Sequence, residues 1–149
     1  PITAVDLDRG GNIKSTLTFS RTEERRNTSL YVKPETYIFE PGPAFLKSGC
    51  FQTIAVKFGL KKLHPHTHLY TSDTVPENFP GKVFEFLGNY PVQKKALPLE
   101  KCNLAIRNFP AETEALRKKL KLKPGGDDMV FACTLCDESK SLLHCRKFD

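Results

Sequence analysis

The sequence contains no tryptophan and a single methionine, Met129, and no run of 18 apolar residues that could cross a membrane as a helix. Its first 30 residues carry charges every few positions and lack the apolar core of a secretory signal. The chain also begins at Pro1 without an initiator methionine. We therefore expect a cytoplasmic protein with no membrane partner, present here as a processed or truncated product.

Local catalytic signatures are missing as well. The sequence has no G-x-G-x-x-G motif, no P-loop and no G-x-S-x-G turn. Gly10-Gly11 follows a strand-like segment but lacks the rest of a nucleotide-binding turn. We predict no catalytic residue and no cofactor-binding residue within this chain.

The five cysteines are too few and too scattered for a disulfide framework, and their number is odd. We expect reduced, mostly buried thiols. Cys133-x-x-Cys136, followed by His144-Cys145, has some features of a zinc site. Cys133 lies in an apolar strand-like run, however, and an offset of three places Cys136 on the opposite face of a strand. We therefore assign no metal ligand here.

Three histidines, His64, His66 and His68, share one face if their segment is a strand, and two of them could hold a metal ion. Pro65 interrupts such a strand, and Asp73 is the nearest carboxylate in the sequence. A metal-binding domain or metal-dependent enzyme is therefore an alternative interpretation, and an ordinary loop entering a strand is the preferred one.

The hydrophobic fraction of 39% over 149 residues is sufficient for a core. In the first half, alternation predicts strands at residues 2–7 and 14–19, joined by a turn at Gly10-Gly11-Asn12. The charged residues 21–27 read as a solvated connection. A helix is predicted from Pro43 to Gly59, and a strand at residues 67–71.

The second half shows short alternating elements. We predict strands at residues 83–87 and 104–106, a helical turn or two at 94–97, and an amphipathic helix at 111–120 with Leu116 and Leu120 facing inward. A final hairpin joins residues 129–135 to 142–145, with Cys133 opposite His144 and Ala132 opposite Cys145. The predicted fold class is α+β, with two small domains at residues 1–80 and 81–149, built on split βαβ sheets with helices packed on one face.

Positive charge is concentrated in one segment. The chain has 23 basic and 17 acidic residues, and residues 101–123 alone hold seven basic against two acidic side chains. Such side chains can neutralise phosphates, although a solvated helix face is the simpler interpretation. The candidate phosphate-binding residues are Arg107, Arg117, Lys118, Lys119, Lys121 and Lys123, with Lys94 and Lys95 at the rim.

Five segments carry a resemblance to a known family. They are YIFEPGPAFLKSG at 37–49, LHPHTHLYTSD at 63–73, FPGKVFE at 79–85, NLAIRNFP at 103–110 and LRKKLKLKPGG at 116–126. Together they resemble the C-terminal region of class I S-adenosylmethionine-dependent methyltransferases of the Bacteroides–Porphyromonas type. In that family a ferredoxin-like segment is followed by a THUMP-like domain. The resemblance covers about three quarters of the chain.

The resemblance implies a ferredoxin-like domain at residues 1–80 and a THUMP-like domain at 81–149. It implies that the catalytic domain, which binds S-adenosylmethionine, lies upstream in the parent enzyme and is a partner of this non-catalytic region. THUMP domains are associated with RNA, usually tRNA, so the resemblance also implies that the eight basic residues named above bind RNA. A structural or dimerisation module that does not contact RNA is the alternative.

Overall fold

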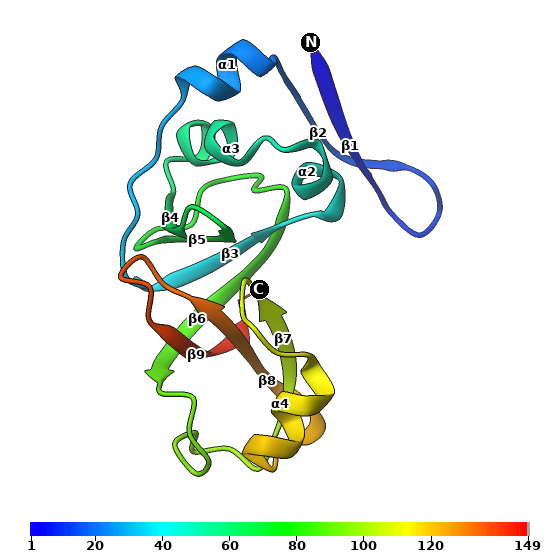
Figure 1. Ribbon diagram of the computed structural model, residues 1–149. Helices are drawn as coiled ribbons and strands as arrows, with labels where there is room; N and C mark the ends of the chain where they lie inside the picture. Colours follow the sequence, from blue (N-terminus) through cyan, green and yellow to red (C-terminus); the bar gives the residue numbers. More distant parts are fainter. Residues whose placement is uncertain (149) are drawn as a thin grey trace.

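The computed structural model describes residues 1–148 and consists of a seven-stranded sheet and a two-stranded sheet, with helices packed against them (Figure 1). The elements in chain order are β1 (Ile2–Leu7), β2 (Ile13–Phe19), α1 (Arg21–Arg26), β3 (Tyr37–Pro41), α2 (Pro43–Ser48), α3 (Phe51–Phe58), β4 (Lys61–His64), β5 (Thr67–Ser72), β6 (Gly81–Tyr90), β7 (Lys101–Arg107), α4 (Thr113–Leu120), β8 (Lys123–Thr134) and β9 (Lys140–Lys147). None of the helices within residues 1–148 is long and apolar enough to cross a membrane.

The larger sheet has seven strands in the order β4-β5-β3-β6-β9-β8-β7. Its neighbours pair antiparallel except β7 and β8, which are parallel and therefore need the crossover that α4 supplies. The β3–β6 pairing joins Pro41 to Gly81, so one sheet runs through both predicted domains. The division after residue 80 stays a prediction.

Successive side chains of the large sheet alternate between an inner core and two outer cores. On β3, Ile38 faces the inner core and Phe39 the core beneath α2 and α3. On β8, Phe131 faces the inner core and Val130 the core beneath α4. Because each half of the sheet carries its helices on its outer face only, the α+β fold class predicted from the sequence is confirmed.

The sheet curls, so that strands far apart in its order come together. The Thr67 hydroxyl at the start of β5 donates to the Thr134 carbonyl at the end of β8 at 2.6 Å. The Asn108 amide, just after β7, donates to the Thr67 hydroxyl at 3.2 Å. These hydrogen bonds join the β5 part of the sheet to the β7–β8 part at one end of the inner core.

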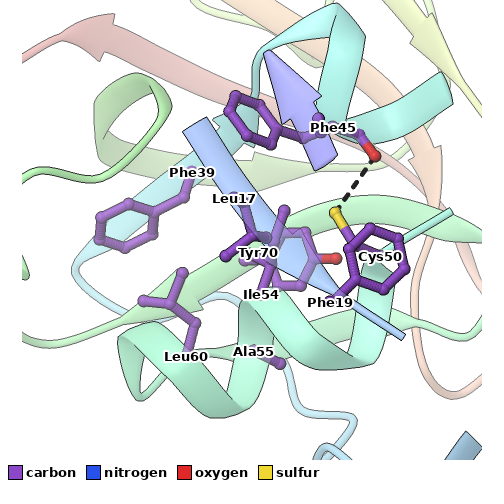
Figure 2. Packing of buried hydrophobic residues seen from close by; sticks show 10 residues of the cluster. Leu17, Phe19, Phe39, Phe45, Cys50, Ile54, Ala55, Leu60 and Tyr70 are labelled. Atoms are coloured by element: carbon purple, nitrogen blue, oxygen red, sulfur yellow. Dashed lines mark hydrogen bonds between the residues drawn. The ribbon is translucent and has the colours of Figure 1, made fainter. Parts of the chain in front are cut away.

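The core beneath α2 and α3 shows why the predicted helix from Pro43 to Gly59 is two helices (Figure 2). Gly49 adopts a φ of 78°, which ends α2, and Cys50 then turns back so that its thiol donates to the Phe45 carbonyl at 3.3 Å. The apolar stripe survives because Cys50 and Ile54 remain buried in the same cluster. The predicted end at Gly59, with a φ of 65°, is confirmed.

The segment predicted as a solvated connection at residues 21–27 contains helix α1. Its start is a capping box, in which the Ser20 hydroxyl accepts from the Glu23 amide at 3.0 Å and Glu23 accepts in return from the Ser20 amide. Glu24 then accepts from the Thr53 amide at 2.8 Å at the start of α3. The Ser-x-x-Glu spacing was the local signal for this helix.

The register of the final hairpin differs from the predicted one. Cys133 lies opposite Ser141 and Ala132 opposite Leu142, whereas His144 lies opposite Val130. The reason is the turn, which is closed by a hydrogen bond from the Leu135 amide to the Ser139 carbonyl and is therefore centred on residue 137. This centre shifts every pair relative to a loop centred between residues 138 and 139.

Two further local predictions need correction. Residues 94–97 form no helix, and the hydrogen bond from the Ala96 amide to the Gln93 carbonyl at 3.1 Å closes a turn over residues 93–96. Strand β4, which pairs with β5, was not predicted, since it has only four residues and begins just two residues after Gly59. By contrast, the β1–β2 hairpin around Gly10-Gly11-Asn12 is confirmed.

Candidate functional site

A hollow lies between the segment that follows β6 and the end of α4. It has a volume of about 550 Å³. In Figure 1 this is the lower end of the molecule, where the loop between β6 and β7 approaches α4. Its lining residues are Gln93, Lys94, Lys95, Leu97, Pro98, Leu99, Glu100, Leu120, Lys121, Leu122 and Lys123.

The hollow has an apolar floor and a basic rim. Leu97, Leu120 and Leu122 are buried and belong to the core beneath α4, so we call them the leucine floor. Lys94, Lys95, Lys121 and Lys123 are exposed, and we call these four the lysine rim. The structure thus brings together four of the eight basic residues predicted from the sequence, drawn from two separate segments.

The end of α4 shapes one wall. Lys121 takes a left-handed conformation with a φ of 53°, and the next amide, of Leu122, donates to the Arg117 carbonyl at 3.1 Å. This turn directs Leu122 back into the core while leaving Lys121 exposed. The Lys123 amide then donates to the Glu100 carbonyl at 2.9 Å, which holds the two walls together.

The charges of the lysine rim are not neutralised within the described chain. No carboxylate in residues 1–148 lies within ion-pair distance of the four ammonium groups, and Glu100 is the only acidic residue among the described residues that line the hollow. Like charges held near one another repel, even though water screens exposed groups strongly. The rim is therefore well suited to an anion.

The other four predicted basic residues lie outside the hollow. Lys118 and Lys119 are exposed on α4 and extend the same basic surface. Arg117 is half-buried and donates to the Cys102 carbonyl at 3.1 Å, so one side of its guanidinium is already engaged. Arg107 forms two hydrogen bonds with the Glu40 carboxylate, and its charge is neutralised by this partner.

The three histidines have separate partners. The Nε2 atom of His64 lies 2.8 Å from a Glu138 carboxylate oxygen, and its Nδ1 atom accepts from the His66 amide at 3.0 Å. That second contact assigns the ring proton to Nε2 in the neutral form. Within the described residues no group of three or more potential ligands is positioned to hold a metal ion.

His68 lies in a different environment, beside a fully buried lysine. Its Nδ1 atom accepts from the Lys62 ammonium at 2.8 Å, and its ring stacks on Phe51 with centroids 3.6 Å apart. Burial, and then the Lys62 charge, lower the pKa of His68 to about 4, so the ring is neutral at physiological pH. Burial lowers the pKa of Lys62 to about 8. Neither Lys62 nor His68 lines the hollow.

The cysteine pattern has no accessible cluster of thiols. Cys133 and Cys145 are buried in the inner core, and Cys136 is half-buried. Burial raises the pKa of Cys133 to about 12, which leaves a neutral thiol and not a metal-binding thiolate. His144 interacts with Asp128 at 2.7 Å.

Two residues that line the hollow were not predicted from the sequence. They are Glu100 and Leu97, the latter a member of the leucine floor. Neither residue belongs to a regular element, so no periodicity marks it. For Leu97 the proline-bounded stretch from Pro91 to Pro98 was the available signal, since such a segment forms a loop whose apolar residues must be buried against a neighbour, whereas no local signal marks Glu100.

Comparison with known proteins supports the two domain types that the sequence resemblance implied. Residues 37–80 match a family model described as a ferredoxin-like domain, and residues 81–147 match one described as THUMP domain-like. The crystal structure of a protein described as a "putative methyltransferase" from Porphyromonas gingivalis W83 superposes with a TM-score of 0.90 at 34% sequence identity. No curated protein matches the chain.

The match to the Porphyromonas protein covers 100% of this chain and 38% of that one, so the present chain spans well under half of its length. The two matched domains meet between Pro80 and Gly81, at the start of β6. The chain therefore carries a ferredoxin-like domain followed by a THUMP-like domain, in the arrangement of a segment of the larger Porphyromonas gingivalis protein.

Proposed function

We propose that this chain is the accessory, substrate-binding region of an S-adenosylmethionine-dependent methyltransferase, and that it binds a tRNA-like RNA through the lysine rim and the adjoining face of α4. The THUMP-like domain and the methyltransferase description of the Porphyromonas protein support this proposal. The chain spans 38% of that protein, so methyl transfer is assigned to the remainder of a longer enzyme.

The convergence of the lysine rim carries the proposal. Lys94 and Lys95 lie before β7, whereas Lys121 and Lys123 follow α4, yet all four line one hollow. Each phosphate that a lysine neutralises releases counterions, so the affinity is expected to fall as salt rises. Contacts of this kind position an RNA and do not read its sequence.

The residues present do not fit S-adenosylmethionine. Cofactor binding in nucleotide-binding folds uses a glycine-rich turn between a strand and a helix. The connection from β7 to α4, at residues 108–112, contains no glycine, and Gly125 and Gly126 lie inside β8. We therefore assign the cofactor to the remainder of the longer enzyme.

A second candidate function is a docking or dimerisation module without RNA contact. One observation favours it, namely the apolar pair Leu7 and Ile13, which lie opposite each other near the tip of the β1–β2 hairpin with 54% and 67% of their surface exposed. Exposed apolar side chains grouped at one place are typical of contact surfaces. The second candidate predicts that basic residues on α4 are dispensable.

The test is a titration of the chain with tRNA at about 50 and 200 mM salt. With the slope for single strands, the four phosphate contacts of the lysine rim alone predict that affinity falls on the order of 50-fold over this range. The double variant Lys95→Gly with Lys121→Gly should show a fall of only about 7-fold, because two contacts remain. Both positions have a positive φ, so glycine removes the charge without straining the backbone.

The matched control is Lys14→Gln with Lys57→Gln, which removes two exposed lysines from outside the hollow. It lowers the net charge equally and should leave the 50-fold dependence unchanged. Absence of binding at low salt, or binding indifferent to salt, contradicts the proposal. Reversal of Lys118, Lys119 and Lys121 to glutamate in the full-length enzyme separates the two candidates, since the docking module predicts unchanged activity.

A further inference from the structure

The hollow offers more than phosphate binding, because its surfaces are of two kinds. The leucine floor is apolar, and the lysine rim above it is basic. A volume of about 550 Å³ lies within the range of small-molecule sites. A paired duplex cannot place a base on such a floor, whereas an unpaired nucleotide presents both an apolar ring face and a phosphate.

Glu100 adds a carboxylate to the hollow, and a carboxylate favours ligand groups that donate hydrogen bonds. Its side chain is exposed and forms no ion pair with any described basic residue, even though four lysines line the same hollow. An ionised carboxylate only accepts hydrogen bonds, and it can accept two side by side. A ligand edge with two adjacent donors is therefore its best complement.

Among the four RNA bases, guanine presents such an edge. Its N1–H and N2–H₂ groups are neighbouring donors, whereas adenine and cytosine pair one amino donor with a ring acceptor that a carboxylate repels. Uracil offers one donor between two acceptors. We propose that the hollow binds one unpaired guanine nucleotide, with its base edge on Glu100, its ring on the leucine floor and its phosphate on the lysine rim.

This inference rests on the proposed RNA-binding function and names the substrate feature that the same site selects. Glu100 is a specificity-determining residue in this arrangement. Its backbone carbonyl already accepts from the Lys123 amide, so a change of its side chain leaves that wall contact in place. The lysine rim supplies affinity that does not depend on the base.

The test measures binding of short single-stranded RNA oligomers that differ at one central position, alongside free GMP, AMP and IMP. We expect the guanine oligomer to bind about tenfold more tightly than the adenine oligomer. Inosine keeps N1–H and lacks the amino group, so the affinity for IMP should lie between the affinities for GMP and AMP. Glu100→Gln should reduce the guanine preference to within about twofold, because an amide both donates and accepts. The control Glu114→Gln, an exposed acid on α4, should retain it.

The outcomes separate the two proposals. Salt-dependent tRNA binding with no base preference, or a guanine preference unaffected by Glu100→Gln, overturns the guanine inference and leaves the proposed function standing. Saturable GMP binding that Glu100→Gln weakens, with no binding of tRNA at low salt, supports a guanine nucleotide site and overturns the RNA function. Loss of base preference in Glu100→Gln together with weakening of all oligomers by Lys121→Gly supports both.

Discussion

The Nε atom of Arg107 donates to the Glu40 carboxylate at 2.8 Å, which joins β7 to β3 although three strands separate them in the sheet. The contact is possible because the sheet curls around its inner core. It also gives Arg107 a structural role, whereas the sequence predicted that this residue contacts RNA. Because the Glu40 carboxylate neutralises this guanidinium and accepts two of its hydrogen bonds, we expect Arg107 to attract a phosphate only weakly.

Replacement of Arg107 should therefore affect stability more than RNA binding. We expect Arg107→Ala to lower the free energy of unfolding by about 1 kcal/mol, since the pair is partly exposed and screened. Urea denaturation measures this loss, and a tRNA titration should show an affinity within about twofold of the original protein. Glu40→Gln should match the stability loss. A large affinity loss at unchanged stability would return Arg107 to the RNA-binding surface.

The left-handed residue at the end of α4 gives a second prediction. Lys121 has a φ of 53°, a region that glycine adopts at no steric cost. Lys121→Gly should leave the thermal stability equal or raise it by up to about 1 kcal/mol, whereas Lys121→Ala should not stabilise the protein. Calorimetry of both variants provides the measurement. A glycine variant clearly less stable than the alanine variant would contradict the role of this turn.

Two glycines are predicted to tolerate alanine very differently. Gly49 has a φ of 78° with open space where a Cβ atom would lie, so Gly49→Ala should cost only about 1 kcal/mol of conformational strain. At Gly81 a Cβ atom would lie 2.1 Å from the Glu40 carbonyl oxygen. Gly81→Ala should therefore cost about 3 kcal/mol or more, because the β3–β6 pairing must shift. Chemical denaturation of the two variants compares these losses directly.

Buried thiols predict that the protein loses stability in alkali. Burial raises the pKa of Cys133 from 9.0 to about 12, so the unfolded chain releases this proton at a lower pH than the folded protein does. The contribution of the protonated Cys133 thiol to the free energy of unfolding is fully present below pH 9. It falls by about 1.4 kcal/mol per pH unit between pH 9 and 12. Cys133→Ala should show a shallower decline in the free energy of unfolding over that interval. Equal slopes for the two proteins would refute this account.

Lys62 acts in the opposite direction. Burial lowers its pKa from 10.5 to about 8, so between pH 8 and 10.5 the unfolded state binds more protons than the folded state. Its contribution to stability therefore rises with pH through this window, by about 3 kcal/mol in total. The difference in free energy of unfolding between the original protein and Lys62→Met should grow by that amount. A difference that does not vary with pH would show that the ammonium is not desolvated.

Much of the local structure could be predicted from local signals. Alternation and a Gly-Gly-Asn turn predicted the first hairpin, and the spacing of Leu116 and Leu120 predicted the buried face of α4. Helix α1 was also accessible, through the capping box at Ser20 and Glu23, but its charged residues suggested a loop. Turn details were less accessible, and the final hairpin was predicted out of register for that reason.

The sequence by itself determined the α+β class, the end of the helix at Gly59 and the basic segment around α4, because these depend on neighbours in the chain. Only the tertiary structure decided that Lys95 and Lys121 line one hollow, that Glu100 accompanies them, and that Arg107 is neutralised by Glu40. The physical reason is that tertiary packing brings together residues far apart in sequence: the curled sheet brings Arg107 to Glu40, and the adjacent starts of β7 and β8 bring Lys123 to Glu100. No local period encodes such pairings, since they arise from burying both faces of one sheet at once.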